Sequence, residues 1–242
     1  MCTQAQRKPV REGMIPGPGG LCDQIVVSTK DLFLIPDGIS YEEASLTEPL
    51  ACCVHSIEIG DIQLGDDVVV IGGGIMGINH VMLAKRKGAR VIISEVDEER
   101  RKLALSLGAD VAINPMECDV VEKVKELTGG RGADVVFNTT AIPSVVPEAI
   151  AMTGSFGKMV QYSSMHPDAP VPVSPQMLHS TQKILTGSIS PTEIDFFRAN
   201  RLISSGIVDM KSLIAATFPF EKAQDAFEKA IVPGTYRVII KG

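Results

Sequence analysis

A glycine-rich turn that joins a short apolar run to a helical segment carries the strongest chemical signal in the sequence. The run 69–71 leads directly into a G-x-G-x-x-G pattern at 72–77, and a helix is predicted immediately after it. Gly72 permits a tight turn, Gly74 lets the backbone approach a pyrophosphate, and Gly77 lets the helix pack closely on a sheet. The unpaired N–H groups of the helix N-terminus would attract the anion. The spacing therefore predicts a dinucleotide site.

An acidic residue follows the next apolar run at the distance that such a site requires. Glu95 comes directly after the run 90–94 and 23 residues after Gly72. Its carboxylate can accept hydrogen bonds from the adenosine ribose hydroxyls and would repel a 2′-phosphate, and no basic residue follows until Arg100. A tight strand-to-helix turn without a ligand is the alternative. Strand, glycines, helix and acid agree, so we predict NAD rather than NADP.

Short apolar runs alternate with longer amphipathic segments from residue 68 onward. Continuous apolar strands separated by helices indicate a parallel sheet that is covered on both faces. The predicted fold class is therefore α/β, a doubly wound parallel-sheet Rossmann domain. The predicted strands span residues 68–71, 90–94, 111–113, 134–138, 158–162 and 183–187.

The pattern differs at both ends of this alternation. Ser40, with Glu43 three residues later, forms a capping box that opens a helical stretch. After Gly187 the tail looks like a different lobe. The elements expected in the two flanks are strands over 24–27, 32–35 and 236–240, and helices near 193–204 and 221–230.

Composition and charge limit the class of partner. The net charge is −6 and no basic run exceeds the cluster 85–87, so nucleic acid is not an expected partner. The five cysteines form no C-x-x-C pair, which disfavours a disulfide framework and a self-contained zinc ribbon. The longest apolar stretch, 68–78, is too short and glycine-rich to span a bilayer. We expect a cytoplasmic protein without a membrane partner.

Several ordered motifs extend over nearly the whole chain. They are Glu48-Pro49-Leu50, the glycine motif, Leu107-Gly108-Ala109-Asp110, the segment 132–136 and Phe218-Pro219-Phe220. Together they resemble the zinc-dependent medium-chain dehydrogenases, in particular the sorbitol and threonine dehydrogenase branch. The resemblance implies a coenzyme domain inserted into a GroES-like catalytic domain. It implies a remnant of that domain with a linking helix at 1–54, a Rossmann NAD-binding domain at 55–189 and a return to the catalytic lobe at 190–242.

The resemblance also implies roles for single residues. Met76 and Arg237 would meet the pyrophosphate, and Arg100 would join Glu95 on the adenosine side. The blander alternatives are a surface cation for Arg100 and polar strand-end residues for the serines. The implied nicotinamide end consists of Ser163, Ser188 and Ile189. The full cofactor-binding set is Gly72, Gly74, Ile75, Met76, Gly77, Glu95, Arg100, Ser163, Ser188, Ile189 and Arg237.

The zinc ligands are where the chain departs from the family pattern. Members bring a cysteine and an adjacent His-Glu pair to the catalytic zinc from a region that would precede Met1, so we expect this chain to lack most of the N-terminal catalytic domain. Glu48 matches the carboxylate that approaches the metal, but three protein ligands are usual. Glu48, Cys52 and His55 share one helix face and could substitute, although helical cysteines are more often small core residues.

The leading interpretation is an NAD-dependent oxidoreductase of the zinc alcohol and polyol dehydrogenase type. It would transfer hydride between a secondary alcohol and NAD. Zinc would be the Lewis acid in full-length relatives, and whether this chain binds zinc is left open. No catalytic residue is assigned, and the missing ligands predict impaired activity. The alternatives are a non-catalytic NAD-binding module or pseudoenzyme and a zinc-free reductase. A small-molecule alcohol is the expected partner, and homo-oligomers are expected because an open sheet leaves edge strands.

Overall fold

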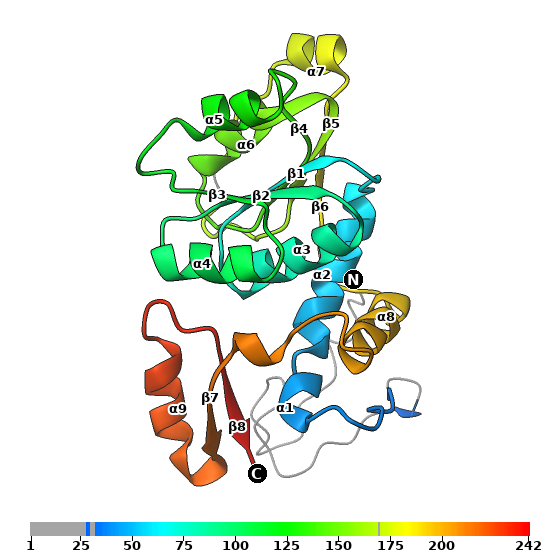
Figure 1. The fold of residues 1–242 in the computed structure, drawn as a ribbon, viewed down its shortest axis with the longest axis vertical. Coiled ribbons are helices and arrows are strands. Elements are labelled where there is room, and N and C mark those ends of the chain that lie inside the picture. Colours follow the sequence, from blue (N-terminus) through cyan, green and yellow to red (C-terminus); the bar gives the residue numbers. More distant parts are fainter. Residues whose placement is uncertain (1–27, 30–31, 169) are drawn as a thin grey trace. The chain divides into compact units, whose positions relative to one another are not determined.

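The computed structural model describes residues 28–29, 32–168 and 170–242. Residues 35–241 form one compact unit, whose helices and strands are drawn in Figure 1. No helix in the described part of the chain is long and apolar enough to cross a membrane. The predicted strand at 24–27 lies outside the described residues.

A six-stranded parallel sheet forms the centre of this unit. The strand order is β3-β2-β1-β4-β5-β6, and every neighbouring pair is parallel. This order confirms the doubly wound α/β prediction. The strands are β1 (Asp67–Ile71), β2 (Arg90–Ser94), β3 (Val111–Ile113), β4 (Ala133–Asn138), β5 (Thr153–Gln161) and β6 (Ile184–Gly187).

Alternate residues of each strand face two helical layers. Val68 and Val70 of β1 pack with α2 and α3, whereas Val69 and Ile71 pack with α5 and α6. Burial on both faces explains why the strands are continuously apolar. The helices are α1 (Tyr41–Ala44), α2 (Thr47–Gly60), α3 (Ile75–Arg86), α4 (Glu98–Ser106), α5 (Val120–Leu127), α6 (Val145–Met152), α7 (Pro175–Thr181), α8 (Glu193–Ser204) and α9 (Ala223–Ala230).

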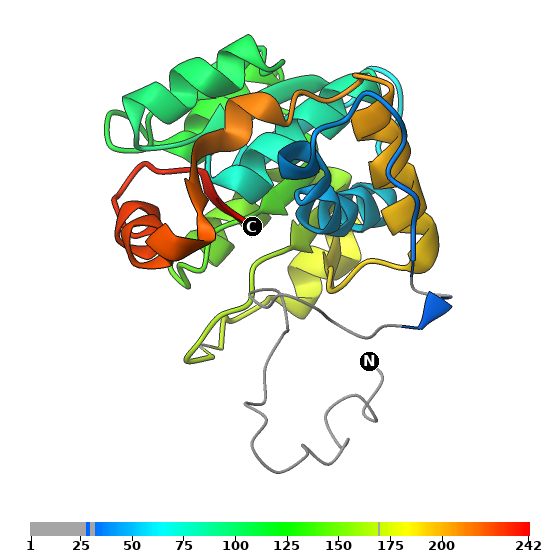
Figure 2. The same cartoon turned by 90° about the horizontal axis from the view of Figure 1, so that it is seen from below.

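The predicted capping box is present, but the helix it opens is short. The Ser40 hydroxyl accepts a hydrogen bond from the Glu43 N–H at 3.2 Å, and the Glu43 carboxylate accepts one from the Ser40 N–H at 3.2 Å. Helix α1 ends at Ala44, and α2 begins at Thr47. Helix α2 then packs against α8, as Figures 1 and 2 both show.

A second, two-stranded sheet lies in the C-terminal part of the unit. Strand β7 (Ile214–Pro219) pairs in parallel with β8 (Arg237–Lys241), and α9 packs on both. The sequence pattern predicts β8 but not β7, because the two alanines and the terminal proline of β7 are weak strand formers. The domain boundaries expected after residues 54 and 189 stay predictions.

The strand predicted at 32–35 is wrong. These residues have irregular structure, and Leu34 is 93% exposed. An apolar run forms a strand only when its backbone pairs with a neighbouring strand and its side chains pack against other residues. The sequence of the run does not show whether such partners exist.

The buried histidine of α3 links this helix to the sheet and to α2. His80 Nδ1 lies 2.7 Å from the Met76 carbonyl, which can only accept, so Nδ1 carries the proton and Nε2 accepts from the Ser56 hydroxyl at 2.9 Å. The ring lies 4.8 Å from the rings of Phe137 and Tyr162. Burial lowers the pKa of His80 to about 4, so the imidazole is neutral at physiological pH.

This burial predicts a loss of stability in mild acid. The unfolded chain binds the proton near pH 6.5 and the folded chain near pH 4, so the contribution is complete above pH 6.5 and is lost as the pH falls through that window. At about 1.4 kcal/mol per pKa unit, the loss in the free energy of unfolding is on the order of 3 kcal/mol. Urea unfolding of His80→Gln should show a shallower decline than wild type. The exposed control His179→Gln should keep the wild-type profile, and a steep decline in His80→Gln would contradict the prediction.

Candidate functional site

A cleft of about 370 Å³ opens where the strand order reverses, between the carboxyl ends of β1 and β4. Ligands of open α/β sheets bind at this reversal, because the loops that leave neighbouring strands diverge there. Four residues of the predicted cofactor set line the cleft, together with two threonines that follow β4. They are Gly72, Gly74, Glu95, Arg100, Thr139 and Thr140.

The three motif glycines have three different geometries. Gly72 has a φ of +94°, which L residues with side chains rarely adopt. A Cβ on Gly77 would lie 1.8 Å from the Gly72 carbonyl oxygen, so helix α3 can approach the turn this closely only without a side chain. Gly74 is the N-cap of α3, and a Cβ there would have no atom within 4 Å. The open space at Gly74 is a cradle at a helix N-terminus, the geometry that suits a phosphate group.

The Glu95 carboxylate holds the glycine turn from the end of β2. Only 6% of this residue is exposed. One oxygen accepts a hydrogen bond from the Gly73 N–H, and the other accepts from the Asp97 N–H at 2.8 Å. Each carboxylate oxygen has a second acceptor position, so these bonds leave capacity for hydroxyl donors in the cleft.

Tyr236 also contacts the glycine turn, and nothing in the sequence predicted this contact. Its hydroxyl donates to the Gly73 carbonyl at 2.9 Å. The Arg100 guanidinium carbon lies 5.7 Å from the centre of the Tyr236 ring, within cation–π distance. Desolvation raises the pKa of Tyr236 to about 12, which keeps the hydroxyl protonated as a donor. No sequence motif marks a single tyrosine beside a strand, so this contact becomes visible only in the folded structure.

Arg100 combines a buried donor with a position on the cleft wall. Its Nε is buried and has no hydrogen-bond partner among the described residues. Such a group costs free energy unless a ligand or water satisfies it. An unsatisfied cationic donor in this position fits an oxygen-rich ligand in the cleft.

The remaining predicted residues lie outside this cleft. Ile75 and Met76 form the first turn of α3, and the Met76 sulfur accepts from the Tyr162 hydroxyl at 3.3 Å. Arg237 begins β8, opposite Ile214. The remaining three lie at the carboxyl ends of β5 and β6: Ser163, which lines a separate hollow of about 620 Å³, Ser188, and the exposed Ile189.

The local zinc site considered on α2 is not formed. Glu48 is exposed and its carboxylate accepts from the Cys52 thiol at 3.4 Å, whereas His55 Nδ1 lies 2.9 Å from Asp195 on α8. Glu48, Cys52 and His55 therefore do not converge, because the imidazole is turned toward another helix, and Glu48 as a metal ligand stays a prediction. The described residues contain no group of three His, Cys, Asp or Glu side chains that could hold a metal ion, so they do not fit a catalytic zinc.

The strand order, the glycine turn and the switch-point cleft are those of a Rossmann-type α/β domain, the fold in which dehydrogenases bind dinucleotides. A model of the zinc-binding dehydrogenase family matches residues 76–205. The chain belongs to this family of oxidoreductases. The family resemblance predicted from the sequence motifs is thereby confirmed.

Individual relatives agree with the family match. The sorbitol dehydrogenase of Bacillus subtilis is 30% identical over 89% of this chain and 61% of its own length. The L-threonine 3-dehydrogenase of Caldanaerobacter subterraneus is 30% identical over 92% of this chain and 64% of its own. A solved structure from Sinorhizobium meliloti, described as a zinc-binding dehydrogenase bound to NADP, has a TM-score of 0.81 and 26% identity over 87% of this chain and 62% of that one. The chain spans about three fifths of the length of these relatives.

The glycine geometry predicts that one alanine substitution lowers stability and that another lowers cofactor affinity. Gly77→Ala should lower the free energy of unfolding by about 3 kcal/mol, because the new Cβ meets a backbone oxygen that cannot move freely. Gly74→Ala should change stability by less than about 1 kcal/mol, because its φ of −67° suits alanine and the space is open. It should nevertheless weaken NADH binding by filling the cradle. Urea unfolding and fluorescence titration measure the two effects, and unchanged NADH affinity in Gly74→Ala would contradict the cradle.

The contact between Tyr236 and Gly73 predicts a positioning effect on the cofactor. Tyr236→Phe keeps the ring under Arg100 and removes one hydrogen bond, so stability should fall by about 1 kcal/mol. The loosened turn should weaken NADH binding severalfold. Tyr41→Phe, at an exposed position, is the matched control. Wild-type affinity in Tyr236→Phe would show that the contact is structural only.

Proposed function

We propose that the chain binds NAD in the cleft at the β1–β4 reversal and is the coenzyme-binding part of an alcohol or polyol dehydrogenase. The observation that carries this proposal is the buried Glu95 carboxylate, which holds the glycine turn and lines the cleft. NAD held there would supply the hydride acceptor for the oxidation of a secondary alcohol. The family match supports this reaction class, as do sorbitol and L-threonine, the hydroxyl compounds in the names of two relatives.

Each part of the cofactor has a candidate set of residues. The pyrophosphate would lie against the N-terminus of α3 at Gly74, Ile75 and Met76, where the N–H groups and the open cradle favour an anion. Arg237 would approach it from β8. The nicotinamide end would lie toward the carboxyl ends of β5 and β6, near Ser163, Ser188 and Ile189.

The adenosine side decides between NAD and NADP. Glu95 would accept from the ribose hydroxyls through its remaining acceptor positions, and a phosphate on the same ribose would face its charge. At about 5 Å and an effective dielectric of about 20, two unit charges interact by about 3 kcal/mol. The positive charge of Arg100 would attract the same phosphate and so reduce the repulsion. Its guanidinium, however, lies over the Tyr236 ring. We propose that the carboxylate dominates and that NAD is preferred, although the Sinorhizobium meliloti structure has NADP bound.

A second candidate function is a non-catalytic NAD-binding module. The observation that favours it is that no three metal-binding side chains come together in the described residues. Activity, a small-molecule alcohol substrate, homo-oligomer formation and a cytoplasmic location remain proposals. NADH formation from sorbitol, threonine and simple secondary alcohols, with and without zinc, separates the dehydrogenase from the module.

Titration with NADH and NADPH tests the cofactor proposal. Wild type should bind NADH at least about tenfold more tightly than NADPH. Glu95→Gln should lower this ratio of affinities, because the amide keeps an acceptor and loses the charge. Glutamine is preferable to alanine here, since Glu95 also holds the Gly73 N–H. Glu98→Gln, an exposed position at the start of α4, is the control for a general change in charge. Equal affinity of wild type for both cofactors would exclude the proposed role of Glu95.

A further inference from the structure

A groove of about 690 Å³ lies between α2, α3 and α8, and it shares no lining residue with the coenzyme cleft. Its floor consists of aliphatic side chains from all three helices. They are Val54 and Ile57 of α2, Leu83 of α3 and Leu202 of α8. Helices α2 and α8 lie side by side in Figures 1 and 2, and their packing holds the floor together.

One wall of the groove is apolar and exposed. Ile194 and Phe197 lie one turn apart on α8 and are 63% and 51% exposed, and Ile207, which follows α8, is 42% exposed. Single exposed apolar residues are ordinary, but three that line one groove add apolar surface to the same site. A ligand with a hydrocarbon part would cover this surface.

The rim is cationic in a chain whose net charge is −6. Four basic residues and one acidic residue line the groove: Arg86, Lys87, Arg198, Arg201 and Glu58. The Glu58 carboxylate is already shared, since Lys87 Nζ lies 2.9 Å from one oxygen and Arg198 lies 3.9 Å from the other. Arg198 also lies 3.8 Å from Asp195, so the surplus of positive charge at the rim belongs to Arg86 and Arg201.

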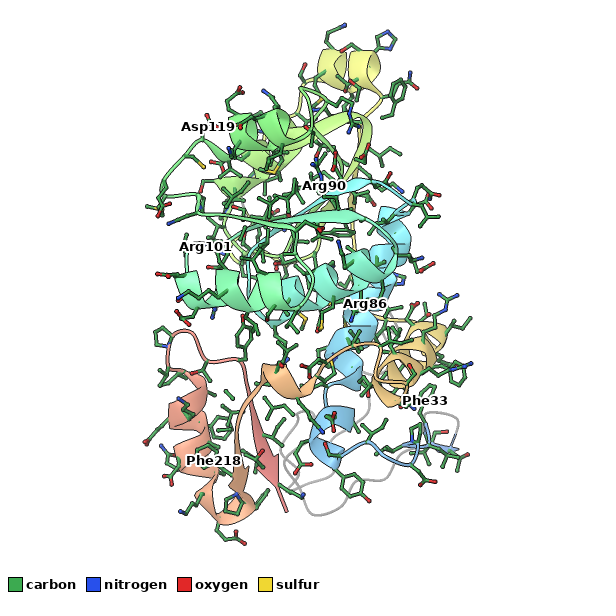
Figure 3. All side chains as sticks on the ribbon, viewed as in Figure 1. Phe33, Arg86, Arg90, Arg101, Asp119 and Phe218 are labelled. Atoms are coloured by element: carbon green, nitrogen blue, oxygen red, sulfur yellow. The ribbon has the colours of Figure 1, made fainter. Side chains whose placement is uncertain are left out.

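Two of the arginines keep their charge available. Arg86, labelled in Figure 3, donates its Nε to the Ile207 carbonyl at 2.9 Å, which orients the side chain without neutralising it. The Arg201 guanidinium carbon lies 5.9 Å from the centre of the Phe197 ring. Neither arginine has an ion-pair partner in the part of the chain that the structure describes. Guanidinium groups bind carboxylates through paired N–H donors.

We propose that this groove binds a long-chain carboxylate, with the hydrocarbon tail on the apolar floor and wall and the carboxylate at Arg86 and Arg201. The volume lies within the range of about 300 to 1,000 Å³ typical of small-molecule pockets. The site is independent of the proposed cofactor and would persist if that proposal failed.

Methyl NMR with dodecanoate, below its micelle concentration, tests the site in the full chain. With isoleucine methyls labelled, the signals of Ile57, Ile194 and Ile207 should shift saturably, and the same signals should not respond to NADH. Dodecanol and dodecyltrimethylammonium share the tail but lack the anionic head, so each should bind at least tenfold more weakly.

Variants separate the contributions of head and tail. Arg201→Gln should weaken dodecanoate binding at least fivefold and leave dodecanol binding unchanged. Ile194→Ser, at an exposed position, should weaken both, and Lys229→Gln on α9 is the matched control for loss of a surface charge. Equal binding of the three amphiphiles, or shifts outside the groove, would overturn the proposal. Methyl shifts that depend on protein concentration without ligand would also overturn it, because a second copy would then cover the groove.

Discussion

The contact between the Glu95 carboxylate and the Gly73 N–H is the constraint on which the site depends. It joins the end of β2 to the turn that follows β1, and the second oxygen holds Asp97, the N-cap of α4. A Cβ on Gly73 would lie 2.9 Å from the Glu95 side chain, so the contact also requires glycine at a position that the motif leaves unspecified. One buried carboxylate thereby fixes the turn and two helix N-termini around the cleft.

The residue that precedes β8 contacts the same turn. Tyr236, one residue before β8, donates to the carbonyl of the glycine whose N–H Glu95 accepts. Gly73 is therefore held through both of its backbone polar groups, which limits rotation of the turn. Arg100 lies over the tyrosine ring and lines the cleft, so Tyr236 contacts one residue of the cleft wall as well as the glycine turn.

The sequence predicted the six-stranded sheet because burial on both faces makes each strand continuously apolar. The strands β2 and β3 and the helix α8 have the predicted bounds. Local pattern failed where tertiary partners decide the outcome. The run 32–35 has irregular structure, and β7 was missed. The contact of Tyr236 could not be predicted from local pattern either, because its partner lies 163 residues away in the sequence.

Amide NMR of the labelled chain during titration with NADH tests the central claim most directly. The claim is that the turn held by Glu95 at the β1–β4 reversal is the coenzyme site. It predicts that the largest saturable shifts occur at the amides of residues 73–76 and of Asp97, because these N–H groups face the pyrophosphate or share the Glu95 carboxylate. Saturable shifts confined to the hollow beside β5 and β6, with these amides unchanged, would contradict the claim.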